Sequence, residues 1–328
     1  MGKLETSYMG LKLKNPLIVG SSGLTAGVDK IAGLEQAGAA AVILKSLFEE
    51  QILGEVDHLL GKDPQNRYPE AADYIRSYTR SHSVEAHLDL LRQARKKTNI
   101  PLIASINCTS PKEWTGFATE FEAAGADALE LNLFYLPTGR NESSASIEKR
   151  YLDVLDAVKK KVRIPVSVKL GSYFTNLVSV TEQLMAHGAV AVTLFNRFYE
   201  PDINLERLEL GPSGLFSNPG DLRKTLRWTG IVSAALPGLE ISASTGIHDG
   251  DAVIKTLLAG ARTAQLCSTV YLNGTRIITG IIQELETFMD KWNFSGIDDF
   301  RGRLSYARIP DPFLYERAQF MKYFSGRD

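Results

Sequence analysis

The chain has little of what several classes of protein require. Cysteine occurs only at Cys108 and Cys267, and the two do not form a CxxC pair, so the sequence indicates neither a disulfide framework nor a zinc site. No apolar run approaches the roughly 20 residues that a membrane-spanning helix needs. Residues 1–10 also lack the apolar core of a signal peptide. These absences predict a protein of the reducing cytoplasm without a transmembrane segment.

An excess of charge of either sign is also missing. The chain has 37 Lys and Arg residues against 38 Asp and Glu residues, and no window gathers the basic ones into a stripe. This balance argues against nucleic acid as a partner and favours a small-molecule substrate. A content of 44% hydrophobic residues is ample for a large core, and no low-complexity linker divides the chain. We therefore expect one domain over residues 1–328.

The sequence does contain a repeated alternation of short apolar strands and amphipathic helices. The strands are rich in Val, Ile, Leu and Ala without polar alternation, as in a parallel sheet that is buried on both faces. Several helices end in a small-residue turn with a central glycine, such as "EQAGAAAV" and "LAGARTAQ". Eight such rounds predict a (β/α)8 TIM barrel, with a doubly wound open sheet as the alternative. The predicted strands are 17–20, 41–44, 102–106, 128–133, 166–170, 189–195, 239–243 and 264–267.

Three segments lie outside this repeat. Residues 4–16 alternate in the manner of a β-hairpin and are expected to cover one end of the barrel. Insertions at 48–83 and 197–220 follow the second and sixth strands, on the face where barrels carry their sites, so we interpret them as lids. An oligomer contact is the alternative for the first insertion, which leaves a homodimer open.

Polar residues follow the predicted strands at their C-terminal ends. A single Asn in this position is often only a turn former. A Lys inside an apolar strand is different, because burying an unpaired ammonium is costly. Lys45 in "VILKS" and Lys169 in "SVKLG" both lie in such apolar strands. We therefore predict a functional site here. The residues at the strand ends are Ser21, Ser22, Gly23, Lys45, Ser46, Asn107, Asn132, Lys169, Asn196, Arg197, Ser244, Thr245, Gly246, Cys267 and Ser268.

The last two strands carry the features of a phosphate site. Thr245–Gly246 and Cys267–Ser268 follow the seventh and eighth strands, the usual place for a phosphate in this fold. The helix that begins in "HDGDAVIKTLL" could add its N-terminus. A phosphate at one side, with amides and lysines in the centre, suits flavin mononucleotide (FMN). A phosphosugar lyase that forms a Schiff base on Lys169 or Lys45 would leave much the same pattern.

In the order and spacing of its motifs, the chain resembles the FMN-dependent dihydroorotate dehydrogenases. The likeness runs from "LKLKNPLIVGSSGLT" through "VILKS", "ALELNL", "IPVSVKL", "TLFNR" and "FSNPGDLRKTLRW" to "SASTGIHDGDAVIKTLLAGARTAQLCSTV" and "GTRIITGIIQEL". The resemblance implies a barrel that binds FMN at its C-terminal mouth. It also implies oxidation of dihydroorotate to orotate by hydride transfer to the flavin, in pyrimidine synthesis.

The resemblance also implies roles for particular residues. It places Ser22 and Gly23 under the isoalloxazine ring, and it makes Lys169 the residue that stabilises the reduced flavin. Asn132, Asn196 and the adjacent Arg197 become substrate contacts. In the phosphate turns, Thr245 and Cys267 each stand where the family has glycine. The full set of implied cofactor contacts is Ser22, Gly23, Lys45, Ser46, Asn107, Asn132, Lys169, Asn196, Ser217, Thr245, Gly246, Cys267 and Ser268.

The chain departs from the family after the fourth strand. Where the family has a Cys or Ser that removes a proton from the substrate, this chain has Tyr135, and Pro137 replaces a substrate-binding Asn. Tyrosine can act as an acid or base, but a phenol with its ordinary pKa of about 10 is a poor base at neutral pH. An aromatic lid over the flavin is the alternative role. We therefore predict Tyr135, Lys45 and Lys169 as catalytic residues, and leave open a different small substrate or flavin binding without turnover.

Overall fold

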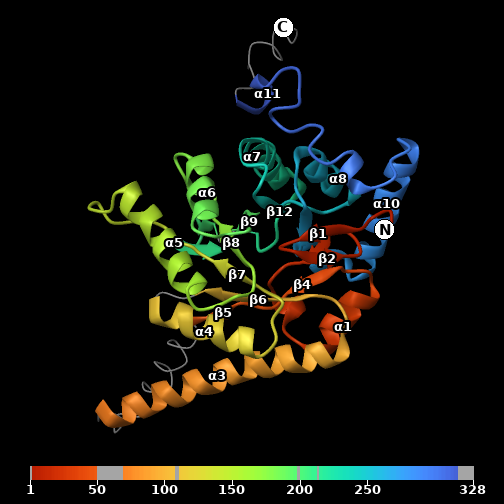
Figure 1. Ribbon diagram of the computed structural model, residues 1–328. Helices are drawn as coiled ribbons and strands as arrows, with labels where there is room; N and C mark the ends of the chain where they lie inside the picture. Colours follow the sequence, from red (N-terminus) through yellow and green to blue (C-terminus); the bar gives the residue numbers. More distant parts are fainter. Residues whose placement is uncertain (1, 50–68, 108–110, 198–199, 213, 317–328) are drawn as a thin grey trace.

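The computed structural model describes residues 2–49, 69–107, 111–197, 200–212 and 214–316. Its centre is a closed barrel of parallel strands (Figure 1). β13 pairs with β3, and β4 pairs with β6, so the sheet closes on itself. This closure confirms the predicted (β/α)8 barrel and excludes a doubly wound open sheet. The barrel strands are β3 (Leu17–Val19), β4 (Ala41–Ile43), β6 (Leu102–Asn107), β7 (Ala128–Asn132), β8 (Val166–Leu170), β9 (Ala191–Leu194), β12 (Glu240–Ser244) and β13 (Thr263–Leu266).

Helices surround the barrel and connect its strands (Figure 1). The predicted glycine turns are present: φ is +110° at Gly38 and +119° at Gly260, in the left-handed region that favours glycine. Each of these glycines ends a helix and lets the chain return at once to the next strand. The helices are α1 (Val28–Gln36), α3 (Pro69–Lys97), α4 (Pro111–Ala123), α5 (Ser144–Lys159), α6 (Leu177–Ala186), α7 (Leu222–Ala235), α8 (Gly250–Ala259), α9 (Ser268–Asn273), α10 (Arg276–Lys291) and α11 (Phe313–Glu316).

An N-terminal hairpin, β1 (Thr6–Tyr8) and β2 (Leu11–Leu13), closes the barrel at the N-terminal ends of its strands. The Met9 amide donates to the Glu240 carboxylate at the start of β12. Tyr8, Met9 and Leu13 are buried with Ile103 and its neighbours inside the barrel. The opposite end, where the strands finish, is thereby left for the site.

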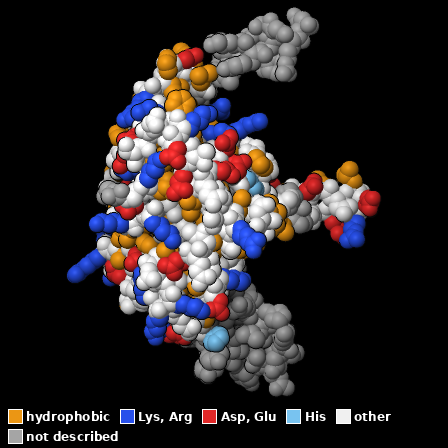
Figure 2. Space-filling view, turned by 90° about the vertical axis from the view of Figure 1, so that its right-hand side faces the viewer, with side chains coloured by type: hydrophobic (Ala, Val, Ile, Leu, Met, Phe, Trp, Pro, Cys, Tyr) orange, Lys and Arg blue, Asp and Glu red, His pale blue; other side chains and the backbone are white. Residues whose placement is uncertain are grey.

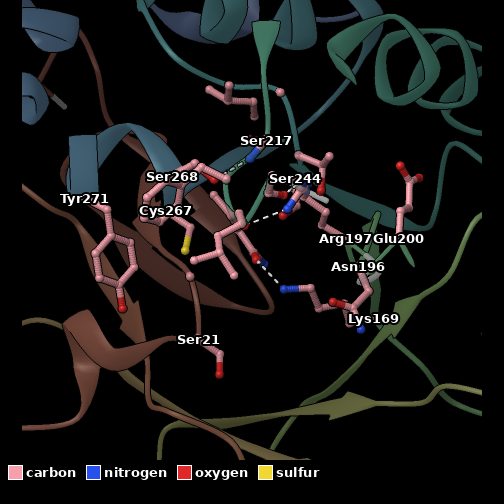
Figure 3. A pocket seen from close by; sticks show the side chains of 18 residues that line it. Ser21, Lys169, Asn196, Arg197, Glu200, Ser217, Ser244, Cys267, Ser268 and Tyr271 are labelled. Atoms are coloured by element: carbon pink, nitrogen blue, oxygen red, sulfur yellow. Dashed lines mark hydrogen bonds between the residues drawn. The ribbon is translucent and has the colours of Figure 1, made fainter. Parts of the chain in front are cut away.

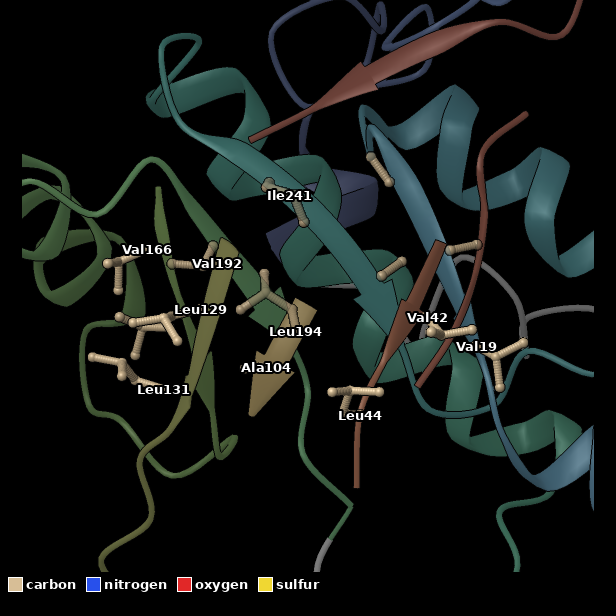
Figure 4. Close-up of a cluster of buried hydrophobic side chains, with 14 of the residues drawn as sticks. Val19, Val42, Leu44, Ala104, Leu129, Leu131, Val166, Val192, Leu194 and Ile241 are labelled. Carbon is tan, nitrogen blue, oxygen red and sulfur yellow. The ribbon is translucent and has the colours of Figure 1, made fainter. Parts of the chain in front are cut away.

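The larger core lies between the strands and the helices. Val42, Leu129 and Ile241 belong to it, and Figure 4 shows their side chains on the barrel strands. From the helix side, α4 contributes Trp114 and Phe117, which are almost fully buried. Burying side chains of this size is the main source of the fold's stability.

The two insertions differ in how much of them the structure describes. Residues 50–68 of the first lie outside the described residues, so its role as a lid stays a prediction. It continues into α3, which projects beyond the other helices in Figure 1. The second insertion forms an antiparallel hairpin of β10 (Pro201–Asn204) and β11 (Glu209–Pro212), and all of β10 is exposed.

Charged side chains of both signs are interspersed on the surface shown in Figure 2. Lys and Arg side chains lie among Asp and Glu side chains on this face, in keeping with the balanced composition. Of the helices in the described ranges, none is both long and apolar enough to cross a membrane.

Candidate active site

A pocket opens at the C-terminal ends of β3, β8, β9, β12 and β13 (Figure 3). Its volume is about 340 Å³, which falls in the range of roughly 300–1,000 Å³ that is usual for small-molecule sites. Figure 3 shows Lys169 and Asn196 on one side of it and Ser268 and Tyr271 on the other. Many residues predicted from the sequence line this pocket: Lys169, Asn196, Arg197, Ser217, Thr245, Gly246, Cys267 and Ser268.

Two further predicted residues touch the residues that line the pocket. Asn132, at the end of β7, accepts a hydrogen bond from the Asn196 side-chain amide at 3.0 Å. The Ser46 hydroxyl lies 2.9 Å from the Ser21 hydroxyl, and Ser21 lines the pocket. The two asparagines thus hold each other in place at the ends of β7 and β9, on either side of β8. The two serines do the same at the ends of the neighbouring strands β3 and β4.

The remaining residues that were predicted to bind the cofactor make contacts elsewhere. Ser22 caps the short helix η1 (Gly23–Thr25). A Cβ atom added to Gly23 would come within 2.7 Å of the Tyr271 hydroxyl, so this backbone passes close to the pocket wall. Lys45 is half-buried beside His87 of α3, and Asn107 ends the ladder between β6 and β5 (Leu47–Phe48). These residues lie at or after the C-terminal ends of β3, β4 and β6 and are not among those that line the pocket.

Lys169 reaches the pocket from a polar network inside the barrel. Its ammonium donates to the Gln265 side-chain carbonyl at 3.4 Å. The Gln265 amide in turn donates to Glu130 Oε2 at 3.0 Å, and the Thr193 hydroxyl donates to the same oxygen at 2.7 Å. Glu130 is fully buried, and its Oε1 lies 3.9 Å from Lys169 Nζ. Lys169 therefore does have the anionic partner that its burial requires.

The hairpin residue Tyr8 adjoins this network. Burial, followed by the charge of Glu130, raises the pKa of the Tyr8 hydroxyl well above its ordinary value. Tyr8 therefore stays neutral beside the carboxylate at physiological pH. Tyr8 thus adds no negative charge to the pair of Glu130 and Lys169.

The turn after β12 has an unusual backbone. Thr245 and Gly246 both have positive φ, at +79° and +82°. For a β-branched residue such as Thr245 this is a rare conformation, and its hydroxyl donates to the Phe195 carbonyl at 3.0 Å. Gly246 cannot be replaced easily, because a Cβ atom there would overlap the Leu222 backbone. Thr245 therefore keeps the left-handed backbone that favours glycine, and it stands where the family that the chain resembles has glycine.

Residues 214–217 form a loop that covers one side of the pocket. Arg197 donates from its guanidinium to the carbonyls of Gly214 at 2.7 Å and Leu215 at 2.6 Å. Phe216 stacks on Tyr271 with ring centroids 5.4 Å apart. The Ser217 amide donates to the Ser268 hydroxyl at 3.0 Å. Arg197, which was predicted to bind substrate, is thus engaged with this loop while it also lines the pocket.

The structure does not bring Tyr135 into this pocket. Its ring lies against Tyr151, edge to face, with centroids 5.3 Å apart, and the Arg150 guanidinium lies over it at 5.7 Å. The Tyr135 amide donates to the Tyr151 hydroxyl, whose pKa is raised to about 12 by burial. Both rings line a separate cavity of about 60 Å³ together with Pro137.

Sequence reasoning missed Glu130 and Gln265. Glu130 is a charged residue in an otherwise apolar strand, which is the signal that singled out the two lysines. It would have been found by the same argument. Gln265 carries no charge, and nothing in the pattern of β13 marks it. Cys108 lies outside the described residues.

The chain was then compared with known proteins. A family model described as dihydroorotate dehydrogenase matches residues 3–289. The chain belongs to the dihydroorotate dehydrogenase family. It is 27% identical over 310 residues to the catalytic subunit of dihydroorotate dehydrogenase B (NAD(+)) from Methanothermobacter thermautotrophicus, covering 91% of this chain and 97% of that protein. It is 26% identical over 317 residues to the putative dihydroorotate dehydrogenase A (fumarate) of Aeropyrum pernix, covering 92% and 97%.

Membership of the dihydroorotate dehydrogenase family makes the chain a flavin-dependent oxidoreductase and does not favour the Schiff-base lyase. The pocket has the donors that a flavin nucleotide needs. Lys169 offers an ammonium that can offset negative charge on a reduced ring. Ser217 and Ser268 also line the pocket with the turn at Thr245, and the Ser217 amide donates to the Ser268 hydroxyl. The residues present therefore fit this cofactor.

Proposed function

We propose that the pocket binds FMN and that the chain oxidises a CH–CH bond of a small ring, with dihydroorotate as the first substrate to test. One observation carries this proposal. A single pocket joins the Lys169 ammonium, held by a buried carboxylate network, to the hydroxyl-rich turns after β12 and β13. The ammonium suits a flavin ring, and the hydroxyl-rich turns suit the phosphate of the flavin nucleotide.

The chemistry requires two separate transfers of hydrogen. Oxidation of dihydroorotate to orotate breaks two C–H bonds, and one hydrogen leaves as a hydride while the other leaves as a proton. Bound FMN supplies the hydride acceptor. Lys169 offsets the negative charge that accompanies reduction, because its ammonium is largely buried where it reaches the pocket. The proton must pass to a protein group or to water.

The other predicted residues are assigned by position. We assign the amides of Asn132 and Asn196 to the substrate, since their mutual hydrogen bond fixes both at the pocket edge. Arg197 assists them by holding the loop 214–217. The proposed flavin contacts are Ser22, Gly23, Lys45, Ser46, Asn107, Asn132, Lys169, Asn196, Ser217, Thr245, Gly246, Cys267 and Ser268.

A second candidate is an FMN oxidoreductase that acts on a different small substrate. The position of Tyr135 favours it, because this residue stands where the family has its base but packs against Tyr151 in a separate cavity. A substrate that needs no such base, or one that is deprotonated elsewhere, would suit this arrangement.

An anaerobic titration of the purified protein tests both candidates. We expect a yellow protein, or one that can be reconstituted with FMN, whose flavin absorbance is bleached by dihydroorotate. A protein that takes up no FMN would refute the proposal. A flavin that is bleached by another reductant in a panel, but not by dihydroorotate, would support the second candidate.

The names of the relatives suggest which electron acceptors to try. One is named for NAD(+) and another for fumarate, so both should be offered to the reduced protein. We also propose a homodimer, because the hairpin β10–β11 exposes Ile203, Leu205, Leu208 and Leu210. Sedimentation analysis of the wild type and of Leu208→Asp tests this, and a monomeric wild type would refute it.

A further inference from the structure

The end of the pocket that would receive a phosphate is short of positive charge. Among the described residues that line the pocket, only Lys169 and Arg197 are cationic. Lys169 is paired with Glu130 inside the barrel, and Arg197 donates to the carbonyls of Gly214 and Leu215. A phosphate at Ser217 and Ser268 therefore needs another donor.

The start of α8 does not fully meet this need. The Gly250 amide donates to the Glu284 carboxylate at 2.7 Å, and the Ala252 amide donates to Asp249 at 2.8 Å. Two of the amides at this helix N-terminus are thus already bonded within the protein. They are not available to an anion in the way that the sequence suggested.

His248 lies immediately beside these groups. Its Nε2 atom is 3.1 Å from the Ser217 hydroxyl, and Ser217 is buried. The His248 carbonyl accepts a hydrogen bond from the Thr269 hydroxyl at 2.8 Å, which ties it to α9. The residue therefore links the turn after β12 both to the covering loop and to the turn after β13.

We propose that His248 is a positioning residue that makes this pocket select a phosphorylated flavin over the unphosphorylated one. When Nε2 carries the proton, it donates to the Ser217 oxygen and leaves the Ser217 hydroxyl proton free to donate to a phosphate oxygen. A hydrogen bond to a charged acceptor is stronger than one between neutral groups. The ring nitrogen thus sets which way the Ser217 hydroxyl points. This inference rests on the proposed function.

The test compares two ligands that differ only in the phosphate. Flavin-free protein is titrated with FMN and with riboflavin, and the dissociation constants are measured by quenching of flavin fluorescence. We expect His248→Ala to weaken FMN binding about tenfold, which corresponds to one lost hydrogen bond of about 1.4 kcal/mol, and to leave riboflavin binding unchanged. His248→Gln, which keeps an N–H donor, should recover part of the FMN affinity.

His187→Ala is the matched control, because His187 pairs with Asp156 at 2.7 Å and is not one of the residues that line the pocket. It should change neither constant. Equal weakening of FMN and riboflavin by His248→Ala would mean a general structural role and would overturn the inference, as would unchanged FMN binding. A wild type that binds FMN keeps the proposed function in either case. A wild type that binds neither flavin overturns both.

Discussion

Lys169 and Glu130 form an ion pair inside the barrel, with Lys169 Nζ 3.9 Å from Glu130 Oε1. The carboxylate is fully buried, the lysine is nearly so, and Oε1 accepts no hydrogen bond within the described structure. The pair spans neighbouring strands, β7 and β8. Glu130 lies inside the barrel and Lys169 lines the pocket. The buried carboxylate thus holds the ammonium at the inner end of the site.

We expect Glu130→Gln to be strongly destabilising, because it leaves a buried ammonium without its counter-charge. Removing one partner of a buried pair costs about 3–5 kcal/mol. The double variant Glu130→Gln, Lys169→Met should recover part of this loss, since no unpaired charge remains. Urea unfolding of the flavin-free protein measures the free energies of unfolding.

The exposed pair of Lys149 and Asp153 on α5 is the matched control. Lys149→Met should change the free energy of unfolding by less than about 1 kcal/mol, because surface pairs contribute little. If Glu130→Gln were as mild as this control, the buried pair would not be a determinant of stability.

Lys169 and Tyr135 are two of the predicted catalytic residues, and their variants should differ in effect. Lys169→Ala removes the charge that offsets flavin reduction, and losing one such stabilising group slows the step by about 10²–10³-fold. Tyr135→Phe removes a hydroxyl whose ring lies in a separate cavity, so we expect a much smaller change. Stopped-flow measurement of anaerobic flavin reduction compares the two rates. Equal or reversed effects would identify Tyr135 as the proton acceptor.

Two neighbouring residues in the turn after β12 should differ in how much a substitution destabilises the protein. Gly246→Ala combines a left-handed backbone, which costs roughly 1–2 kcal/mol, with overlap onto the Leu222 backbone, for which overpacking costs about 1–3 kcal/mol. Thr245→Gly relieves the same backbone cost. It also loses a hydrogen bond worth about 1 kcal/mol and adds chain entropy worth roughly 0.5–1 kcal/mol, so the net change should be small.

Gly10 provides the control for this comparison. Its φ is +77°, but a Cβ atom there would meet nothing within 4 Å. Gly10→Ala should therefore show only the backbone cost. Thermal or urea unfolding measures the stability of both variants. If Gly246→Ala lost no more stability than Gly10→Ala, the turn would be able to shift and accommodate the added methyl group.

The barrel could be predicted from the sequence because its strands are apolar on both faces and its helices end at glycine turns. Both are local patterns, and the largest error, at β9, is two residues at its start, where 189–195 is expected and Ala191–Leu194 is observed. The site was predicted less completely. Lys169 was found because a buried charge in an apolar strand is costly without a partner. Its partner Glu130 lies 39 residues earlier, and the pairing of β7 with β8 brings the two together.

The direction of Tyr135 could not be predicted for a related reason. A residue after a strand can turn toward the pocket or toward the helix that follows, and the choice depends on what packs there. Here Tyr151 of α5 and Phe174 offer an aromatic cluster, with Tyr151 lying 5.3 Å from the Tyr135 ring and 5.4 Å from the Phe174 ring. This tertiary packing decides the outcome, and it is not encoded in the local pattern of residues 134–137.

His87 of α3 should make the protein lose stability in mild acid. Burial is the main cause that lowers the pKa of its imidazole, and the charge of Lys45 adds to it. The folded pKa is below the unfolded value of 6.5, so the unfolded chain binds the proton more readily and stability falls as the pH drops below that value. We expect wild-type protein to lose more stability between about pH 7.5 and about pH 5 than His87→Asn, which cannot titrate.

The asparagine variant is chosen because the His87 ring donates from Nδ1 to the Ser83 carbonyl at 2.9 Å, and an amide can also donate. His82→Asn, at an exposed position of the same helix, is the control substitution. Urea midpoints at the two pH values give the comparison. Parallel losses in the wild type and in His87→Asn would show that other groups govern the acid response. A difference confined to His87 would mean that its protonation sets a second positive charge beside Lys45, at the edge of the site.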